Sequence, residues 1–158
     1  MLINNSEIKI RPANNADCEN VQKLVFRILD EYGLKPDLPG TDKDITDIEA
    51  NYINRGGIFE IFEDANGNLL GTVGLFPIDD ETIELRKMYF SKAIRGRGLG
   101  KKTLQKMIET AKKLGYNRIF LETANVLKEA IGLYESFGFT SATEKHTPRC
   151  DRSFYYNL

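Results

Sequence analysis

One glycine-rich run, RGRGLG at positions 95–100, combines residue types that suit the binding of an anion. Glycines expose main-chain N–H groups, and the amphipathic pattern that follows places these groups at the N-terminus of a helix, where partial positive charge gathers. Cations at a helix N-terminus oppose the macrodipole, so their presence here favours a phosphate-bearing ligand over the alternative, a flexible solvated loop. Five cations and no acid lie in and beside the run: Lys92, Arg95, Arg97, Lys101 and Lys102.

Two common phosphate-binding patterns do not fit this run. The P-loop requires a glycine five residues before its Gly-Lys pair and a serine or threonine after it, whereas this chain has Arg95 and Lys102 at those positions. The dinucleotide pattern G-x-G-x-x-G can begin at Gly96 but meets Lys101 at its last position, and no strand–helix–strand unit precedes it. The ligand is therefore not predicted to be bound in either of these ways.

The elements that position the run can be predicted from apolar spacing and turn residues. Strands are expected at 7–11, 58–63, 69–76, 82–90, 118–122, 139–143 and, as an edge strand, 153–157. Helices are expected over 98–114 and 126–137, preceded by a first helix that carries Val21, Leu24, Val25, Ile28 and Leu29 and a second short one that carries Ile45, Ile48, Tyr52 and Ile53. The three central strands form an antiparallel meander, and the later strand–helix–strand crossover makes 82–90 and 118–122 parallel.

Composition is typical of one mixed α/β domain over residues 1–158. The chain is 41% hydrophobic and 28% charged, and its net charge of −1 argues against general nucleic-acid binding. No apolar stretch could span a membrane, and the N-terminus does not resemble a signal peptide, so we expect a cytoplasmic protein. Cys18 and Cys150 lie far apart and His146 is the one histidine, so no metal site is predicted.

Three motifs at matched separation resemble the GCN5-related N-acetyltransferase (GNAT) superfamily. The run from Arg95 fits the pattern Q/R-x-x-G-x-G/A of its pyrophosphate loop. The segment from Glu84 to Phe90 resembles the strand before that loop, and the segment from Ala130 to Phe139 resembles a second motif, A-x-x-L-Y-x-x-x-G-F. Residues 58–140 follow the order of elements in the family. The resemblance implies a mostly antiparallel sheet of six or seven strands, flanked by about four helices, in which 82–90 and 118–122 splay apart.

The resemblance also implies acetyl-CoA as cosubstrate, bound in the gap between these two strands. Main-chain groups near the end of strand 82–90 would pair with the pantetheine arm, and an N–H near Phe90 would polarise the thioester carbonyl. The glycine-rich run would hold the pyrophosphate. The implied binding residues are Met88, Tyr89, Phe90, Arg95, Gly96, Arg97, Gly98, Leu99, Gly100 and Lys101. Many relatives have an asparagine where this chain has Leu127, so that contact is not expected here.

Direct attack of an amine on the thioester, in a ternary complex, is the chemistry that the resemblance implies. Tyr134 takes the position of the tyrosine that protonates the departing thiolate, and its alternative role is that of a core aromatic. Glu84 takes the position of a general base, and its alternative is an ion pair with Arg86 on the same strand face. The alternative for the whole chain is a non-catalytic acyl-CoA-binding sensor or interaction module.

The acceptor is expected to be an amine of a small molecule or peptide. Seven acids over residues 30–49 could form an acidic rim for a cationic amine, although helix caps explain most of them equally well: Asp30, Glu31, Asp37, Asp42, Asp44, Asp47 and Glu49. Alternatively, His146, Arg149 and Arg152 could meet a carboxylate on the acceptor. An exposed sheet edge near 153–157 could support a homodimer. Neither a nucleic acid nor a membrane is expected as partner.

Overall fold

One seven-stranded sheet organises the described part of the computed structural model, which comprises Asn4 and residues 7–158. The strand order is β1-β2-β3-β4-β5-β7-β6, and every neighbouring pair is antiparallel except β4 and β5. The mostly antiparallel sheet and its one parallel pair are therefore confirmed. The strands are β1 (Lys9–Pro12), β2 (Ile58–Glu63), β3 (Leu69–Pro77), β4 (Thr82–Phe90), β5 (Arg118–Thr123), β6 (Thr140–Ala142) and β7 (Arg152–Asn157).

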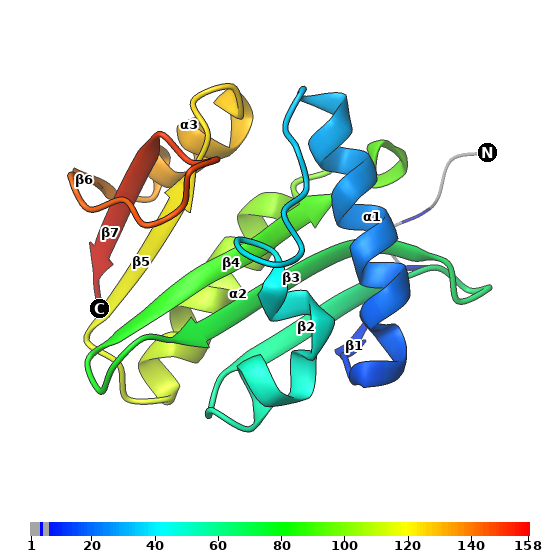
Figure 1. Ribbon diagram of the computed structural model, residues 1–158, viewed down its shortest axis with the longest axis horizontal. Helices are drawn as coiled ribbons and strands as arrows, with labels where there is room; N and C mark the ends of the chain where they lie inside the picture. The colour runs from blue at the N-terminus through cyan, green and yellow to red at the C-terminus, as the bar shows by residue number, and fades with distance from the viewer. Residues whose placement is uncertain (1–3, 5–6) are drawn as a thin grey trace.

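Helices cover both faces of the sheet. The first, α1 (Cys18–Glu31), lies on one face, and α2 (Leu99–Lys113) lies on the other (Figure 1). The apolar stripe of α1 packs against β2, where Phe59 and Ile61 are buried, as its helical spacing predicts. The stripe of α2 packs against Val73 and Leu75 of β3 together with residues of α3 (Lys128–Ser136). Each face therefore has its own apolar core.

Residues 43–53 do not form the α-helix that their spacing predicts. Instead, a 3₁₀ helix spans Lys43–Thr46 and a short π-helix spans Glu49–Ile53. The buried hydroxyl of Tyr52 donates a hydrogen bond to Asp44. In a straight α-helix these residues would be separated by a rise of about 12 Å, so this contact requires the helical path to break between them. Of the four predicted apolar positions, Ile45, Ile48 and Tyr52 are nevertheless fully buried, whereas Ile53 is exposed.

The prediction that 153–157 is an edge strand is wrong. β7 lies between β5 and β6 and pairs with β5 along its whole length, from Arg118 opposite Asn157 to Thr123 opposite Arg152. Its residue Phe154 is fully buried in the core that also contains residues of α2 and α3. The outermost strand on this side is the three-residue β6, so the free edge on which a homodimer was expected is not at β7.

β4 and β5 splay apart, as the resemblance implies. Their pairing ends at Glu84 opposite Phe120, although β4 continues to Phe90, and Figure 1 shows the two strands diverging. β4 also contains a bulge, because Thr72 pairs with Tyr89 while Gly74 pairs with Arg86. A bulge bends its strand and increases the local twist, which helps to open the gap on the far side of β4.

Lys87 occupies the bulge in a backbone conformation that side-chain-bearing residues rarely adopt, with φ 54°. The hydroxyl of Thr72 donates a 2.7 Å hydrogen bond to the Lys87 carbonyl and so holds the bulge from β3. The Lys87 side chain is buried and lies 3.3 Å from Asp42 and 3.1 Å from Asp44. These contacts stabilise the strained backbone at the point where the strands diverge.

Candidate active site

A cavity of about 980 Å³ lies beside the diverging strands. The glycine-rich loop and α3 line it, together with the segment after α1 and the loop between β6 and β7. Arg95 of the glycine-rich loop contacts Glu31 at the end of α1, and Arg149 of the β6–β7 loop bonds to the Lys35 carbonyl, so the segment after α1 runs from one end of the cavity to the other. β4 forms a floor common to both ends, since residues from Glu84 to Phe90 all line the cavity. A space of this size and position can hold two small ligands in contact.

The glycine-rich loop closes one end of the cavity. Gly96 and Gly98 both have φ 76°, which only glycine adopts easily, and Gly98 is the N-cap of α2. The first bond back to this cap is donated by the N–H of Lys102, so the preceding N–H groups at the helix N-terminus need another partner. Gly96, Gly98, Leu99 and Gly100 line the cavity, as an anion site in this loop requires.

The cationic side chains of the loop differ in whether they line the cavity. Arg95 lines the cavity, but its Nε donates a 2.7 Å hydrogen bond to the Phe90 carbonyl and its Nη1 lies 2.8 Å from Glu31. Arg97 bonds to the Ala93 carbonyl and does not line the cavity; nor does Lys101. The loop therefore offers main-chain N–H groups to the cavity, while Arg95 ties the loop to α1.

The last residues of β4 present a main-chain edge to the cavity. Met88, Tyr89 and Phe90 all line it, and they lie beyond the last residue of β4 that pairs with β5. Within the described residues this edge has no strand beside it. Leu127 lines the cavity where many relatives have asparagine, whereas Asn125 does not line it and donates its backbone N–H to Asp151.

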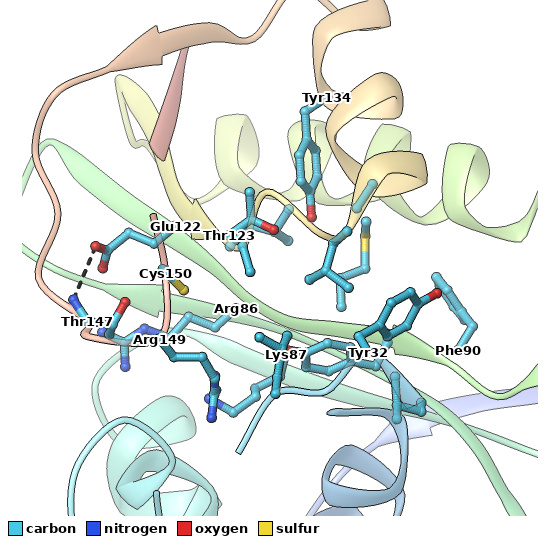
Figure 2. Close-up of a pocket in the computed structure, with 18 of the residues that line it drawn as sticks. Tyr32, Arg86, Lys87, Phe90, Glu122, Thr123, Tyr134, Thr147, Arg149 and Cys150 are labelled. Carbon is cyan, nitrogen blue, oxygen red and sulfur yellow. Dashed lines mark hydrogen bonds between the residues drawn. The ribbon is translucent and has the colours of Figure 1, made fainter. Parts of the chain in front are cut away.

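Tyr134 joins the apolar core to the cavity. Its ring centroid lies 5.7 Å from that of Phe139 and 6.2 Å from that of Phe154, and the residue is 6% exposed. Figure 2 shows the side chain descending from α3 with its hydroxyl in the cavity. Burial raises the pKa of this hydroxyl above its ordinary value, so the phenol keeps its proton at neutral pH. The ring is a core aromatic and the hydroxyl is available as a proton donor.

Glu84 lies on the cavity floor and forms an ion pair with Arg86, which was the predicted alternative to a role as general base. Its Oε1 lies 2.7 Å from Nη2 of Arg86 and accepts a 2.9 Å hydrogen bond from Nε. The Arg86 guanidinium stacks 3.7 Å from the centroid of Phe76. Burial raises the pKa of Glu84 and outweighs the opposing charge of Arg86. The carboxylate is thus both paired and more basic than an exposed glutamate.

The predicted acidic rim does not form. Of its seven acids, all in the described part of the chain, Asp37 alone lines the cavity. Asp42 is fully buried, and its carboxylate accepts bidentate hydrogen bonds of 2.7 and 2.8 Å from Arg149. Burial by itself would raise the pKa of Asp42, but the Arg149 hydrogen bonds and the charge of Lys87 lower it overall. Asp42 and Asp44 therefore balance cations that the bulge and the β6–β7 loop turn inward, whereas Asp47 and Glu49 accept backbone N–H groups.

The loop between β6 and β7 was expected to offer His146, Arg149 and Arg152 to an acceptor carboxylate. His146 lines the cavity, but Arg152 does not. Arg149 lines it too, with its charge already neutralised by Asp42. Figure 2 shows Arg149, Thr147 and Cys150 gathered on one side of the cavity, close to Glu122 of β5.

Glu122 and Cys150 are cavity residues that sequence reasoning missed. A signal for Glu122 exists, since strand alternation places it on the same face as Phe120, which is opposite Glu84. No comparable signal exists for Cys150, because the loop that carries it has no regular period. Among the described residues there is no group of three or more potential metal ligands, and none of the helices there could cross a membrane.

Comparison with known proteins identifies the class of enzyme to which this site belongs. The model of the acetyltransferase (GNAT) family matches residues 24–139. The uncharacterised N-acetyltransferase YjgM of Escherichia coli is 36% identical over 124 residues, which cover 75% of this chain and 74% of that protein. The chain therefore belongs to the GNAT family, and it is an acetyl-CoA-dependent N-acetyltransferase.

Solved structures agree with this assignment. A GNAT-family acetyltransferase from Staphylococcus aureus is 30% identical and superimposes with a TM-score of 0.87, covering 96% of this chain and 99% of that one. A phosphinothricin acetyltransferase from Sinorhizobium meliloti, solved with AcCoA, shares the fold at 17% identity with a TM-score of 0.72, covering 96% of this chain and 89% of the other.

Proposed function

We propose that this enzyme transfers the acetyl group of acetyl-CoA to a primary amine of a small molecule or peptide, by direct attack in a ternary complex. The observation that carries the proposal is the continuity of the cavity. One space joins the glycine-rich loop at one end to the carboxylates of Glu84 and Glu122 at the other, with the Tyr134 hydroxyl beside it. Donor and acceptor can therefore occupy it together.

The residues at the loop end suit acetyl-CoA. The N–H groups before Lys102 and the positive end of α2 fit a pyrophosphate, because both favour negative charge. The main-chain edge from Met88 to Phe90 fits the amide-bearing pantetheine arm, which pairs as a strand would. The S. meliloti relative, which holds AcCoA on the same fold, supports this choice of donor. Acetyl-CoA would supply an activated thioester.

The chemistry requires two proton transfers that this chain can serve. The amine nitrogen forms a bond to the thioester carbon, the carbon–sulfur bond breaks, and its electron pair remains on sulfur. An acceptor that enters as an ammonium group first loses one proton, for which Glu84 is the proposed base, so that its nitrogen can attack. The thiolate gains one proton, for which Tyr134 is the proposed acid, and the second proton that the nitrogen loses as the amide forms restores the Tyr134 phenol. A buried, more basic carboxylate and a protonated phenol are the states that these roles need.

Release of free thiol from acetyl-CoA, measured against a broad panel of amines, tests the proposal. We expect at least one amine to stimulate release and to gain an acetyl group on nitrogen, as mass spectrometry of the product would show. The panel should include amino acids, polyamines, aminoglycosides and peptides. Tight acetyl-CoA binding without amine-stimulated thiol release would contradict the proposal and favour the alternative, a non-catalytic acyl-CoA-binding sensor or interaction module.

A further inference from the structure

Glu122 has an unusual set of partners for a carboxylate on a cavity wall. Its Oε1 accepts hydrogen bonds from the backbone N–H groups of His146 and, at 3.3 Å, Thr147. Within the described residues it makes no ion pair, although it is half-buried and lines the cavity. Figure 2 shows it at the acceptor end, with the hydrogen bond to Thr147 drawn. Glu122 is thus an oriented carboxylate whose charge has no counter-ion.

The other cavity carboxylates differ from Glu122 in partner or place. Glu84 pairs with Arg86. Asp37 accepts the N–H of Thr41 within its own turn, and Glu129 is exposed in the first turn of α3. Glu122 instead lies on the sheet, two residues beyond Phe120, which pairs with Glu84. Burial is the largest cause of the raised pKa of Glu84, and the negative charge of Glu122 raises it further.

Glu84 has its counter-ion in Arg86, whereas within the described residues the negative charge of Glu122 has no ion-pair partner at the cavity wall. An ammonium group would neutralise that charge, and it brings three N–H donors that can meet more than one acceptor. The second oxygen of Glu122 is available for one of them, because both loop N–H groups bond to Oε1. A charge-assisted hydrogen bond of this kind is stronger than a neutral one.

We propose that Glu122 binds the ammonium group of the acceptor and presents it to Glu84. The role rests on the proposed function and makes the acceptor a cationic amine, recognised before it loses its proton. Glu122 holds the amine, whereas Glu84 receives the proton, so the two carboxylates have separable effects on kinetics. Arg149 is a positioning residue in this scheme, because its bond to Asp42 fixes the loop that orients Glu122.

Steady-state kinetics of Glu122→Gln with the best amine of the panel test this role. Glutamine keeps an oxygen for the N–H groups of His146 and Thr147, so the loop should stay in place while the charge is lost. We expect the acceptor KM to rise about tenfold or more, with kcat within about threefold and acetyl-CoA affinity unchanged. Glu144→Gln is the matched control, since Glu144 is exposed in the same loop and does not line the cavity.

A second readout keeps the role testable if the variant is poorly folded. The hydroxyl analogue of the acceptor, which has no positive charge, should inhibit the wild type much less strongly than a non-reactive ammonium analogue. In Glu122→Gln that preference should largely disappear, whereas Glu122→Asp, which keeps the charge, should retain part of it. An acceptor KM within twofold of wild type, or a loss confined to kcat, would overturn the proposal. Absence of any amine-stimulated thiol release by the wild type would overturn the proposed function instead, and the acceptor role with it.

Discussion

The ring of Tyr134 packs in the apolar core and its hydroxyl lies in the cavity, so one substitution separates its structural role from its proposed catalytic role. Tyr134→Phe keeps the ring that packs on Phe139 and Phe154 and removes the hydroxyl in the cavity. We expect kcat to fall about 100-fold, with acetyl-CoA affinity and the free energy of unfolding nearly unchanged. Thiol release, isothermal titration with acetyl-CoA and urea unfolding check these three quantities. Full activity would remove Tyr134 from the mechanism.

Glu84 must be ionised to accept a proton, so its role predicts a pH dependence. Burial raises its pKa, and kcat/KM should therefore rise with pH through a value above that of an exposed glutamate. Glu84→Gln should lower kcat/KM by about 100-fold or more and abolish this acidic limb. Glu81→Gln, a change at an exposed position at the start of the same strand, is the control. An unchanged pH–rate profile for Glu84→Gln would exclude it as the base.

The positions of candidate residues could be predicted where a sequence motif contains them, whereas their roles stay predictions. The motif match placed both Glu84 and Tyr134 on a cavity, and the structure puts them there. It could not show that Arg95 bonds to Glu31, because that contact depends on how α1 packs against the loop. Glu122 was not predicted, because a glutamate near the end of a strand indicates no functional site until the position of the neighbouring loop is known.

At the scale of elements, the glycine loop and α3 offer a matched pair of substitutions. Gly98 caps α2 with φ 76°, so Gly98→Ala should lower the free energy of unfolding by about 1–2 kcal/mol and weaken acetyl-CoA binding. Gly132 lies within α3 with open space around it, so Gly132→Ala should be neutral or stabilise the protein by up to about 1 kcal/mol. Chemical denaturation measures both, and equal effects would contradict the role given to Gly98.

The spacing of apolar residues correctly predicted the elements that pack one apolar face against one of the two cores. The stripe on α1 and the central meander of strands are confirmed to within a few residues. It failed for 43–53, where a buried bond between Asp44 and Tyr52 overrides helical spacing. It also failed for the place of β7, because strand order depends on long-range pairing that a local pattern does not contain.

On the scale of the whole molecule, buried charge links three distant segments. Asp42, after α1, meets Lys87 of the β4 bulge and Arg149 of the β6–β7 loop. Because its pKa is lowered in the folded state, the ionised carboxylate contributes stability above the pKa of the unfolded chain, and this contribution is lost as pH falls. The ion pairs of Asp42 with Lys87 and Arg149 thus tie the segment after α1 and the β6–β7 loop to the sheet.

Asp42→Asn should therefore destabilise the protein at pH 7, where it leaves buried cations short of a counter-ion, by about 3–5 kcal/mol. The difference from wild type should begin to shrink as pH falls below about 4, where Asp42 of the unfolded chain takes up a proton, and should go on shrinking as pH falls through the lowered pKa of the folded state. Urea unfolding across this pH range measures the difference. Asp80→Asn, at an exposed turn, should show none, and a pH-independent gap for Asp42→Asn would contradict the charge argument.

The central claim is that donor and acceptor meet in one cavity and react directly. Initial rates of thiol release, measured while acetyl-CoA and the amine are varied together, test this most directly. Direct transfer predicts double-reciprocal lines that intersect, and an enzyme whose mass is unchanged after incubation with acetyl-CoA alone. Parallel lines, together with an acetyl group on Cys150 of the cavity wall, would show a covalent intermediate and contradict the account.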